Sequence, residues 1–453
     1  MDNNALDHTT EHTTAEHTTN ESRTAHDAGW RKSRYLIHAA VPETRDTVFV
    51  NLLTGKQSTC GRAELYLLDI LDELPEDHPA ISHLAKLGLI VNYDEFAVLE
   101  AKSRALSGFP SDVHLTVCPT LGCNFDCPYC FEEHRGKSMD EKTQNDVVKL
   151  ADRMLSVSHA PKLVITWFGG EPLLEPHIIK SLSERLIETA ENHGATYSAD
   201  MLTNGYLLDP DMVSLLQSCR IDNIQITIDG IGSTHDATRH TVSGGPSFDR
   251  IIHNLRTELP FRVNIRHNVH SGNIDEVNKL KDFVAKLAEE TGNTFSYYPT
   301  PVTGSPVADA RGKQITLLSG REESSIFIES TPKFRSTGHF CNASYFWAMG
   351  IDPDGNLIKC IDNIENTSLA FGRAETWDPL HPLETADHPD HLSVFINKGT
   401  ALSDEECRSC IWLPLCNGGC PFIRMFEKKH CVPFKDDPEW YALKMSRGRV
   451  PRT

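Results

Sequence analysis

Cysteines are the residues of this sequence whose number and spacing point most directly to chemistry. The chain has 13 of them, of which four lie in residues 118–130 and seven in residues 341–431. The first group contains Cys123-Asn-Phe-Asp-Cys127-Pro-Tyr-Cys130, with the spacing C-x3-C-x2-C. Three thiolates this close together can hold three corners of a cubane iron–sulfur cluster and leave its fourth iron without a protein ligand. A zinc site completed by His134 is the alternative that the spacing leaves open.

The C-terminal cysteines follow a second pattern. It consists of C-x2-C, five residues, C-x3-C and a last cysteine, and two further cysteines precede it. A zinc ribbon is one interpretation of this pattern, but it would leave three cysteines of the group unused. That ribbon would be built from Cys407, Cys410, Cys416 and Cys420. Three cysteines lie outside both patterns, and they are Cys60, Cys118 and Cys219. They are predicted to be buried packing residues, with a position facing the active site as the alternative for Cys118, which ends the first predicted strand.

Alternating strands and helices are predicted to position the first motif. Six apolar or β-branched runs between residues 112 and 301 are predicted strands, and helical stretches separate them. This alternation indicates an α/β fold with a parallel sheet, arranged as a partial barrel. Polar segments such as 169–171 and 227–230 follow strand ends, where α/β enzymes place their chemistry. The expected strands are 114–117, 163–168, 197–202, 223–228, 261–269 and 294–298, and the expected helices are 141–155, 178–193, 248–259 and 274–290.

Residues 112–301 resemble the radical S-adenosylmethionine (SAM) superfamily. The resemblance rests on the first cysteine motif, which has an aromatic residue before its last cysteine, and on three segments at successive strand ends. These segments are Gly169-Gly-Glu-Pro172, Leu202-Thr-Asn-Gly205 and Ile226-Thr-Ile-Asp-Gly230. The resemblance implies a partial (β/α)6 TIM-like barrel and a [4Fe-4S] cluster on Cys123, Cys127 and Cys130. Reduction of that cluster would cleave the SAM bound to its open iron, and the 5′-deoxyadenosyl radical would abstract a hydrogen atom from the substrate.

The same resemblance implies roles for other residues. The segment Gly169-Gly170-Glu171 is expected to bind the amino group of SAM, with the Glu171 carboxylate accepting a charge-assisted hydrogen bond. Thr227 and Arg239 are candidates for contacts with the ribose or the carboxylate of SAM. Asp229 is the candidate general base, and a turn residue without catalytic function is the alternative at that position.

Residues 341–431 resemble the SPASM domain, which implies two auxiliary [4Fe-4S] clusters and therefore three clusters in the chain. The first auxiliary set has three cysteines, so its cluster is expected either to have an open iron that binds a substrate thiolate or to use His339 as a fourth ligand. The second set has four cysteines and is complete. The sets are Cys341, Cys360 and Cys420 for the first, and Cys407, Cys410, Cys416 and Cys431 for the second.

The segment 33–103 is predicted to be a separate winged-helix-like module of strands and helices. It resembles the precursor-peptide recognition element of peptide maturases, which binds a leader peptide by strand addition. A domain that merely covers the barrel opening is the alternative. We expect a disordered tail in residues 1–29 because it repeats His-Thr-Thr with almost no apolar content. Residues 302–340 are expected to be a linker, and residues 432–453 a basic peripheral tail.

Charge and composition exclude several classes of partner. Lys plus Arg is 44 and Asp plus Glu is 63, which gives a net charge of -19. Nucleic acid and anionic membrane surfaces are therefore disfavoured as partners. No apolar run is long enough to span a bilayer, and the N-terminus lacks the features of a signal peptide. We therefore expect a cytoplasmic protein with reduced thiols, in which disulfides do not explain the cysteines.

These observations predict an enzyme, a radical SAM oxidoreductase of the peptide-maturase type. It would oxidatively modify a ribosomally synthesised precursor peptide, recognised through its leader, by forming a thioether or another crosslink. A flavodoxin or ferredoxin is the expected electron donor. Formylglycine formation, as in anaerobic sulfatase maturation, and peptide epimerisation are the alternative reactions. A zinc-binding scaffold without enzymatic activity is the alternative outside the enzymes.

Overall fold

The structure is a computed structural model, and it describes most of the chain. The described residues are 29–42, 44–108, 110–133, 136–302, 307–308, 314–315, 317–318, 323, 326, 341–426 and 431–446. The predicted N-terminal tail up to residue 28, most of the predicted linker, His134 and His339 lie outside them. Among the described residues, no helix has the length and apolar content needed to cross a membrane.

The central element is an open sheet of nine strands in the order β11-β10-β9-β8-β7-β6-β14-β15-β16. Strands β6 to β11 are parallel to one another and follow chain order. This arrangement confirms the predicted α/β fold with a partial barrel, and the sheet does not close. Apolar side chains fill the interior, and Leu115, Ile165 and Ile226 are completely buried. The six strands are β6 (Val113–Val117), β7 (Lys162–Trp167), β8 (Thr196–Thr203), β9 (Ile221–Thr227), β10 (Arg262–Val269) and β11 (Phe295–Pro301).

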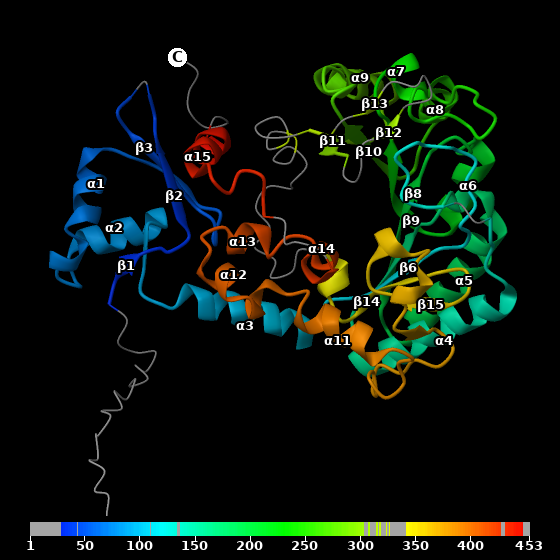
Figure 1. The fold of residues 1–453 in the computed structure, drawn as a ribbon, viewed down its shortest axis with the longest axis horizontal. Coiled ribbons are helices and arrows are strands. Elements are labelled where there is room, and N and C mark those ends of the chain that lie inside the picture. Colours follow the sequence, from blue (N-terminus) through cyan, green and yellow to red (C-terminus); the bar gives the residue numbers. More distant parts are fainter. Residues whose placement is uncertain are drawn as a thin grey trace, which may run out of the picture.

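Helices follow these strands and cover the sheet (Figure 1). Helix α4 buries Val147, Leu150 and Met154, which share one helical face. Asp side chains mark two N-termini: Asp140 accepts from the N–H of Thr143 at 2.7 Å, and Asp209 caps α6 in the same way. Helix α6 is absent from our sequence predictions, although Asp209 followed by proline is a helix-start signal. The helices are α4 (Glu141–Ser158), α5 (Pro176–Asn192), α6 (Pro210–Ser218), α7 (Ser233–Asp236), α8 (Phe248–Leu255) and α9 (Glu276–Thr291).

The C-terminal cysteine-rich region is joined to the same sheet. Strand β14 (Ala348–Ile351) pairs with β6 in parallel, with Gly350 opposite Thr116. Strands β15 (Asn356–Ile358) and β16 (Gly372–Arg373) extend the sheet antiparallel. The segment after β15 lies next to the loop that follows β6, because Ile361 and Ile364 pack in one cluster with Leu121. The other described elements of this region are α11 (Pro389–Asn397), α12 (Glu405–Ser409), α13 (Leu413–Cys416) and α14 (Pro421–Phe426), and a short hairpin of β12 (Val307–Ala308) and β13 (Gln314–Ile315) precedes them.

The N-terminal module contains a three-stranded antiparallel sheet with both faces buried. Its strand order is β2-β3-β4. On one face Phe49 and Cys60 pack in a cluster with the helices α1 and α2. On the other face Ile37 and Val50 pack in a cluster with residues from the C-terminal region. The elements are β1 (Arg31–Lys32), β2 (Leu36–Ala40), β3 (Thr47–Asn51), β4 (Gln57–Cys60), α1 (Arg62–Asp69), α2 (Pro79–Leu87), β5 (Ile90–Val91) and α3 (Glu95–Gly108).

The end of the chain contributes to that second cluster, which differs from the peripheral tail expected from residue 432. Helix α15 (Pro438–Ser446) lies against β2 (Figure 1), and Tyr441 is only 4% exposed. The ring centroid of Trp412 lies 5.1 Å from that of Phe434 and 5.2 Å from that of Tyr441. Apolar residues after residue 432 are buried although this segment is basic. They pack in one cluster with residues of the N-terminal module and of the cysteine-rich region, so the two regions share one core.

Candidate active site

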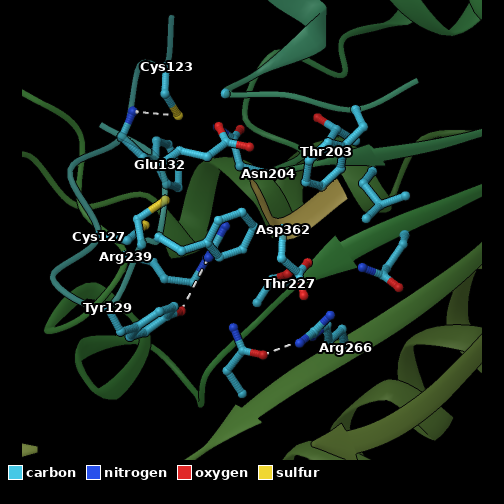
Figure 2. Close-up of a pocket in the computed structure, with 18 of the residues that line it drawn as sticks. Cys123, Cys127, Tyr129, Glu132, Thr203, Asn204, Thr227, Arg239, Arg266 and Asp362 are labelled. Atoms are coloured by element: carbon cyan, nitrogen blue, oxygen red, sulfur yellow. Dashed lines mark hydrogen bonds between the residues drawn. The ribbon is translucent and has the colours of Figure 1, made fainter. Parts of the chain in front are cut away.

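A cavity of about 300 Å³ lies at the carboxyl ends of the parallel strands (Figure 2). Each strand from β6 to β11 contributes side chains or backbone to its wall, either from its last residues or from the loop that follows. This placement confirms that the predicted strand-end segments converge. The lining includes Cys123, Cys127, Tyr129, Cys130, Glu132, Gly169, Gly170, Thr203, Asn204, Gln225, Thr227, Arg239, Arg266, Asn268, Pro301 and Asp362.

The loop that carries the three cysteines is held by backbone contacts and by one buried ring. Phe125 is 1% exposed and packs edge-on against Tyr206. The N–H of Phe125 donates to the Sγ of Cys123 at 3.4 Å. Burial raises the pKa of Cys123 to about 12 and that of Cys127 to about 11. Thiolates at these positions need compensating positive charge, which the irons of a cluster supply. The donor set therefore fits an iron–sulfur cluster.

Two glycines bring the loop after β7 against the cysteine loop. A Cβ on Gly170 would lie 2.3 Å from the carbonyl oxygen of Gly122, which is shorter than any van der Waals contact. Gly169 has a φ of 121°, a conformation that favours glycine. A Cβ there would lie 2.4 Å from the Sγ of Cys118. The two glycines thus place bare backbone on the cavity wall.

Glu171 does not line this cavity. Its side chain is completely buried, and its carboxylate accepts hydrogen bonds from three protein donors. They are the N–H of Leu173 at 3.0 Å, the hydroxyl of Thr203 at 2.7 Å and the N–H of Asn204 at 2.7 Å. We expected Glu171 to contact the SAM ammonium directly. In the structure its hydrogen bonds instead connect the ends of β7 and β8.

Asp229 also lies behind the cavity wall. It is completely buried, and its Oδ2 accepts hydrogen bonds from the hydroxyls of Tyr129 and Thr238. Tyr129 does line the cavity, and it accepts a hydrogen bond from Arg239 at 3.2 Å. Burial, together with the Asp229 charge, raises the pKa of Tyr129 well above its ordinary value, so the phenol stays protonated. The predicted general base therefore reaches the cavity only through Tyr129.

Thr227 and Arg239 line the cavity as predicted, and other lining residues were not predicted. Arg266 and Asn268 alternate along β10 with the buried Ile265 and Val269, and the Nε of Arg266 donates to Asn268 at 2.9 Å. This period of two is the sequence signal that identifies them. Asp362 belongs to the segment after β15, and no local pattern predicts its place in this cavity.

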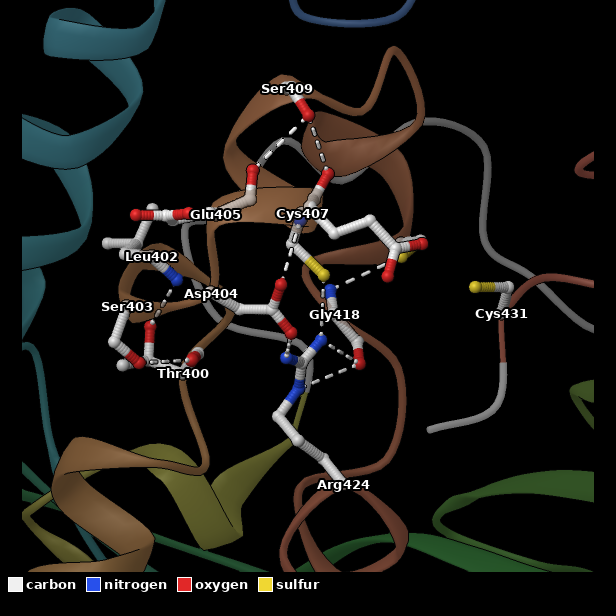
Figure 3. A network of polar contacts seen from close by, with 12 residues as sticks. Thr400, Leu402, Ser403, Asp404, Glu405, Cys407, Ser409, Gly418, Arg424 and Cys431 are labelled. Carbon is white, nitrogen blue, oxygen red and sulfur yellow. Dashed lines mark hydrogen bonds and ion pairs between the residues drawn. The ribbon is translucent and has the colours of Figure 1, made fainter. Parts of the chain in front are cut away.

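The set of four C-terminal cysteines lines a small cavity of about 20 Å³. Burial raises the pKa of Cys416 to about 11, and its three partners in the set add to that effect as neighbouring charges. Figure 3 shows Arg424 beside Cys407 of this set. Its Nη2 donates to the Sγ of Cys407 at 3.1 Å, and its Nη1 forms an ion pair with Asp404 at 2.9 Å. The cysteines that line the cavity are Cys407, Cys410, Cys416 and Cys431.

The set of three cysteines is also brought together. Cys341 and Cys360 contact the same apolar cluster, which includes Phe395. Burial raises the pKa of Cys360 to about 12, and it raises the pKa of Cys341, to which Cys420 contributes as a neighbouring charge. The fold thus brings Cys341, Cys360 and Cys420 into one region, although up to 79 residues separate them in the chain (341 to 420).

The remaining cysteines are buried, as we expected. Cys60 and Cys118 have no exposed surface, and Cys219 is 1% exposed. The thiol of Cys118 donates to the carbonyl oxygen of Thr120 at 3.2 Å and packs beneath Gly169. It is not among the residues that line the active-site cavity. Cys118 therefore supports the glycine loop from below.

Comparison with known proteins agrees with this geometry. Residues 117–284 match the Radical SAM superfamily. The chain is 23% identical over 367 residues to the Fe-coproporphyrin III synthase of Methanosarcina barkeri, covering 73% of this chain and 88% of that protein. It is 23% identical over 350 residues to the cysteine-type anaerobic sulfatase-maturating enzyme of Clostridium perfringens, covering 70% of this chain and 89% of that enzyme.

A solved structure of native anSMEcpe with bound AdoMet and Cp18Cys peptide shares the fold. The TM-score is 0.55 at 19% sequence identity, and the match covers 74% of this chain and 97% of that one. The chain is thus similar in sequence to a sulfatase-maturating enzyme and shares its fold with a peptide-bound structure.

Proposed function

Because residues 117–284 form a radical SAM domain, we propose that this enzyme oxidatively modifies a ribosomally synthesised precursor peptide by forming a thioether or another crosslink. The observation that carries the proposal is the cavity in which the cysteine loop, the glycine loop and the polar ends of β8 to β10 meet. The structural relative anSMEcpe binds both AdoMet and a peptide, which supports a peptide as the substrate. A zinc-binding scaffold without activity does not fit a radical SAM domain.

We assign the radical-generating [4Fe-4S] cluster to Cys123, Cys127 and Cys130, and SAM to the space beside it. SAM bound to this cluster supplies the 5′-deoxyadenosyl radical. The backbone of Gly169 and Gly170 binds the amino group of SAM, and Thr227 and Arg239 bind its ribose or carboxylate. In this proposal Glu171 is a positioning residue, because its oxygens already accept hydrogen bonds from protein donors.

The C-terminal cysteines would hold two auxiliary [4Fe-4S] clusters. The set around Arg424 offers four thiolates and completes its cluster, whereas the set of Cys341, Cys360 and Cys420 offers three. An open iron there would accept a substrate thiolate. Crosslinking removes two electrons, and an auxiliary cluster is a suitable acceptor for the second. We expect a flavodoxin or ferredoxin as the electron donor, in the cytoplasm, where thiols stay reduced.

The N-terminal module would bind the leader of the precursor peptide. Strand β4 is an edge of the three-stranded sheet and pairs, among the described strands, only with β3. An extended leader can add to such an edge through main-chain hydrogen bonds. Removing the whole module would expose Trp412 and Tyr441 in the shared core. A proline at Thr59 of β4, whose backbone N–H points away from β3, is therefore the better test, because it removes a donor for strand addition while the β3–β4 pairing and the core remain.

One experiment tests the proposed function. The anaerobically reconstituted enzyme should contain about 12 iron and 12 sulfide per chain. It is incubated with SAM, a reductant and the short peptide encoded beside its gene, and the peptide mass is measured. Loss of two hydrogen atoms from the peptide indicates a crosslink. A mass that is unchanged in ordinary water, together with deuterium uptake in D2O, indicates epimerisation. SAM cleavage without any change in the peptide would overturn the proposal.

Formylglycine formation is the second candidate, and the sulfatase-maturating relative favours it. A peptide with a sulfatase-type Cys or Ser site distinguishes the two functions, because formylglycine carries an aldehyde that a hydrazine reagent captures. Conversion of that peptide, with the neighbouring peptide left unmodified, would establish the second candidate in place of the first.

A further inference from the structure

A second cavity, of about 390 Å³, adjoins the active-site cavity. Both are lined by Phe131, Glu132 and Asp362, so the two spaces lie side by side. The second cavity is also lined by Glu133 and Glu365, and no lysine, arginine or histidine among the described residues contributes to it. Its wall is therefore acidic and its position is next to the place where a substrate would react.

Two carboxylate oxygens in this wall have no hydrogen-bond partner within the described part of the chain. They are the Oε1 of Glu132 and the Oε1 of Glu365. Glu132 is only 8% exposed, and its side chain is drawn among those that line the active-site pocket in Figure 2. A carboxylate in such a position is costly unless a donor or a positive charge meets it. The other oxygen of Glu365 accepts a hydrogen bond from the N–H of Glu133 at 2.5 Å.

The carboxylates of this wall are not gathered as the ligands of a single metal ion would be. Among the described residues, the one group whose potential ligand atoms all lie within 4.8 Å of one another is His388, Asp390 and His391. Glu132, Asp362 and Glu365 do not form such a group. Carboxylates distributed along a cavity can instead accept the several N–H donors of an ammonium or a guanidinium group.

We propose that Glu132, Asp362 and Glu365 form an acidic subsite that binds a lysine or arginine side chain of the peptide substrate, close to the residue that is modified. This inference rests on the proposed function and deepens it, because it names a chemical feature of the peptide. The bound cation pairs with the two oxygens that lack partners. The subsite selects peptides in which a basic residue lies near the reacting residue.

The test uses the full, cluster-loaded chain and the peptide encoded beside its gene. Each Lys and Arg of the peptide is replaced by Met in turn, and kcat and KM are measured for the wild-type enzyme and for Glu365→Gln. One peptide replacement should raise KM about tenfold or more with the wild-type enzyme, because a charge-assisted contact is lost. The same replacement should have little further effect with Glu365→Gln, as a double-mutant cycle requires for a direct contact.

A charge exchange guards against misfolded variants. The Glu365→Lys enzyme should modify the wild-type peptide poorly. It should regain activity with a peptide in which Glu replaces the basic residue whose loss raises KM. Exchanging Lys for Arg in the peptide distinguishes the two cations. Glu258→Gln, an exposed residue elsewhere on the domain, is the matched control and should leave the KM for the peptide unchanged.

Three results would overturn the inference. The first is modification of a peptide that contains no lysine or arginine. The second is that no replacement of a Lys or Arg in the peptide changes KM. The third is that the effects of the peptide replacement and of Glu365→Gln on KM are additive in the double-mutant cycle. A different result separates it from the proposed function. If the wild-type enzyme cleaves SAM but leaves the unaltered peptide unmodified, the proposed function itself fails, and this inference fails with it.

Discussion

The carboxylate of Glu171, after β7, accepts a hydrogen bond from the backbone N–H of Asn204, after β8, at 2.7 Å. The side chain of Asn204 in turn donates to the Oδ1 of Asn124 at 2.7 Å. Asn124 lies in the cysteine loop, between Cys123 and Phe125. A buried carboxylate thus connects the strand ends to the loop that carries the proposed cluster, and its role is to position both.

Replacing Glu171 by Gln should weaken this connection. The amide offers one acceptor oxygen where the carboxylate offers two, so at least one buried donor loses its partner. We expect the free energy of unfolding to fall by about 1–3 kcal/mol and the Kd for SAM to rise. Anaerobic urea unfolding and equilibrium dialysis measure the two quantities. Glu188→Gln, on the exposed face of α5, is the control, and equal values for both variants would contradict the positioning role.

Replacing Gly170 by Ala should separate the glycine loop from the cysteine loop. The new Cβ would meet the Gly122 carbonyl oxygen at 2.3 Å, and backbone on both sides leaves no flexible group to move. We expect SAM cleavage to fall by more than about tenfold, as for overpacking at a rigid site. Release of 5′-deoxyadenosine measures it. Gly29→Ala, where nothing lies within 4 Å, should behave like the wild type, and an active Gly170→Ala enzyme would refute the tight contact.

The stability of the enzyme should decrease in mild acid because of His235. Burial and the nearby Arg239 guanidinium lower the pKa of His235 from 6.5 to about 4. Its Nδ1 accepts the N–H of Asp229 at 3.2 Å. The unfolded chain therefore binds this proton more readily, so the stabilisation is complete above pH 6.5 and is lost as the pH falls toward 4. The shift corresponds to about 3 kcal/mol.

Urea unfolding between pH 7 and pH 4.5 tests this prediction. His235→Asn keeps an acceptor near the position of Nδ1 and should show a shallower dependence of stability on pH than the wild type. Part of the dependence should remain, because burial also lowers the pKa of His267 to about 4. At each pH, the difference in the free energy of unfolding between the wild type and His235→Asn removes the acid sensitivity that both proteins share. Parallel curves would show that His235 does not titrate as expected.

Replacing Trp412 by Ala should affect both the N-terminal module and the adjacent cysteine set. Trp412 is 2% exposed, and its indole N–H donates to the carbonyl oxygen of Lys435 at 2.9 Å. We expect a loss of about 3–5 kcal/mol in stability, together with iron loss confined to the cluster that the neighbouring cysteines are proposed to hold. Iron analysis measures this loss. Tyr66→Ala, at a residue that is 64% exposed, should keep its full iron content.

Replacing Arg424 by Gln should lower the reduction potential of the proposed cluster on the four-cysteine set. The guanidinium donates to the Cys407 sulfur at 3.1 Å, and both its charge and its hydrogen bond favour the reduced cluster. We expect a decrease on the order of tens of millivolts in a redox titration followed by electron paramagnetic resonance. Arg256→Gln, on the exposed surface, controls for the change in net charge, and identical potentials would exclude this effect.

The sequence by itself determined the parallel sheet and the residues of the radical SAM motif, because both depend on short-range patterns. Cys123, Cys127 and Cys130 lie within eight residues, and the strand period and the polar strand ends are equally local. The grouping of the C-terminal cysteines was also predicted, because resemblance to a known spacing substitutes for knowledge of the fold.

Only the tertiary structure decided which side chains face the cavity and which lie behind it. Glu171 and Asp229 sit in motifs at strand ends, yet burial and protein donors place both behind the wall. Asp362 reaches the cavity because β14 pairs with β6, more than 230 residues earlier in the chain. Such long-range pairings depend on the packing of the whole chain, and no local pattern in the sequence encodes them.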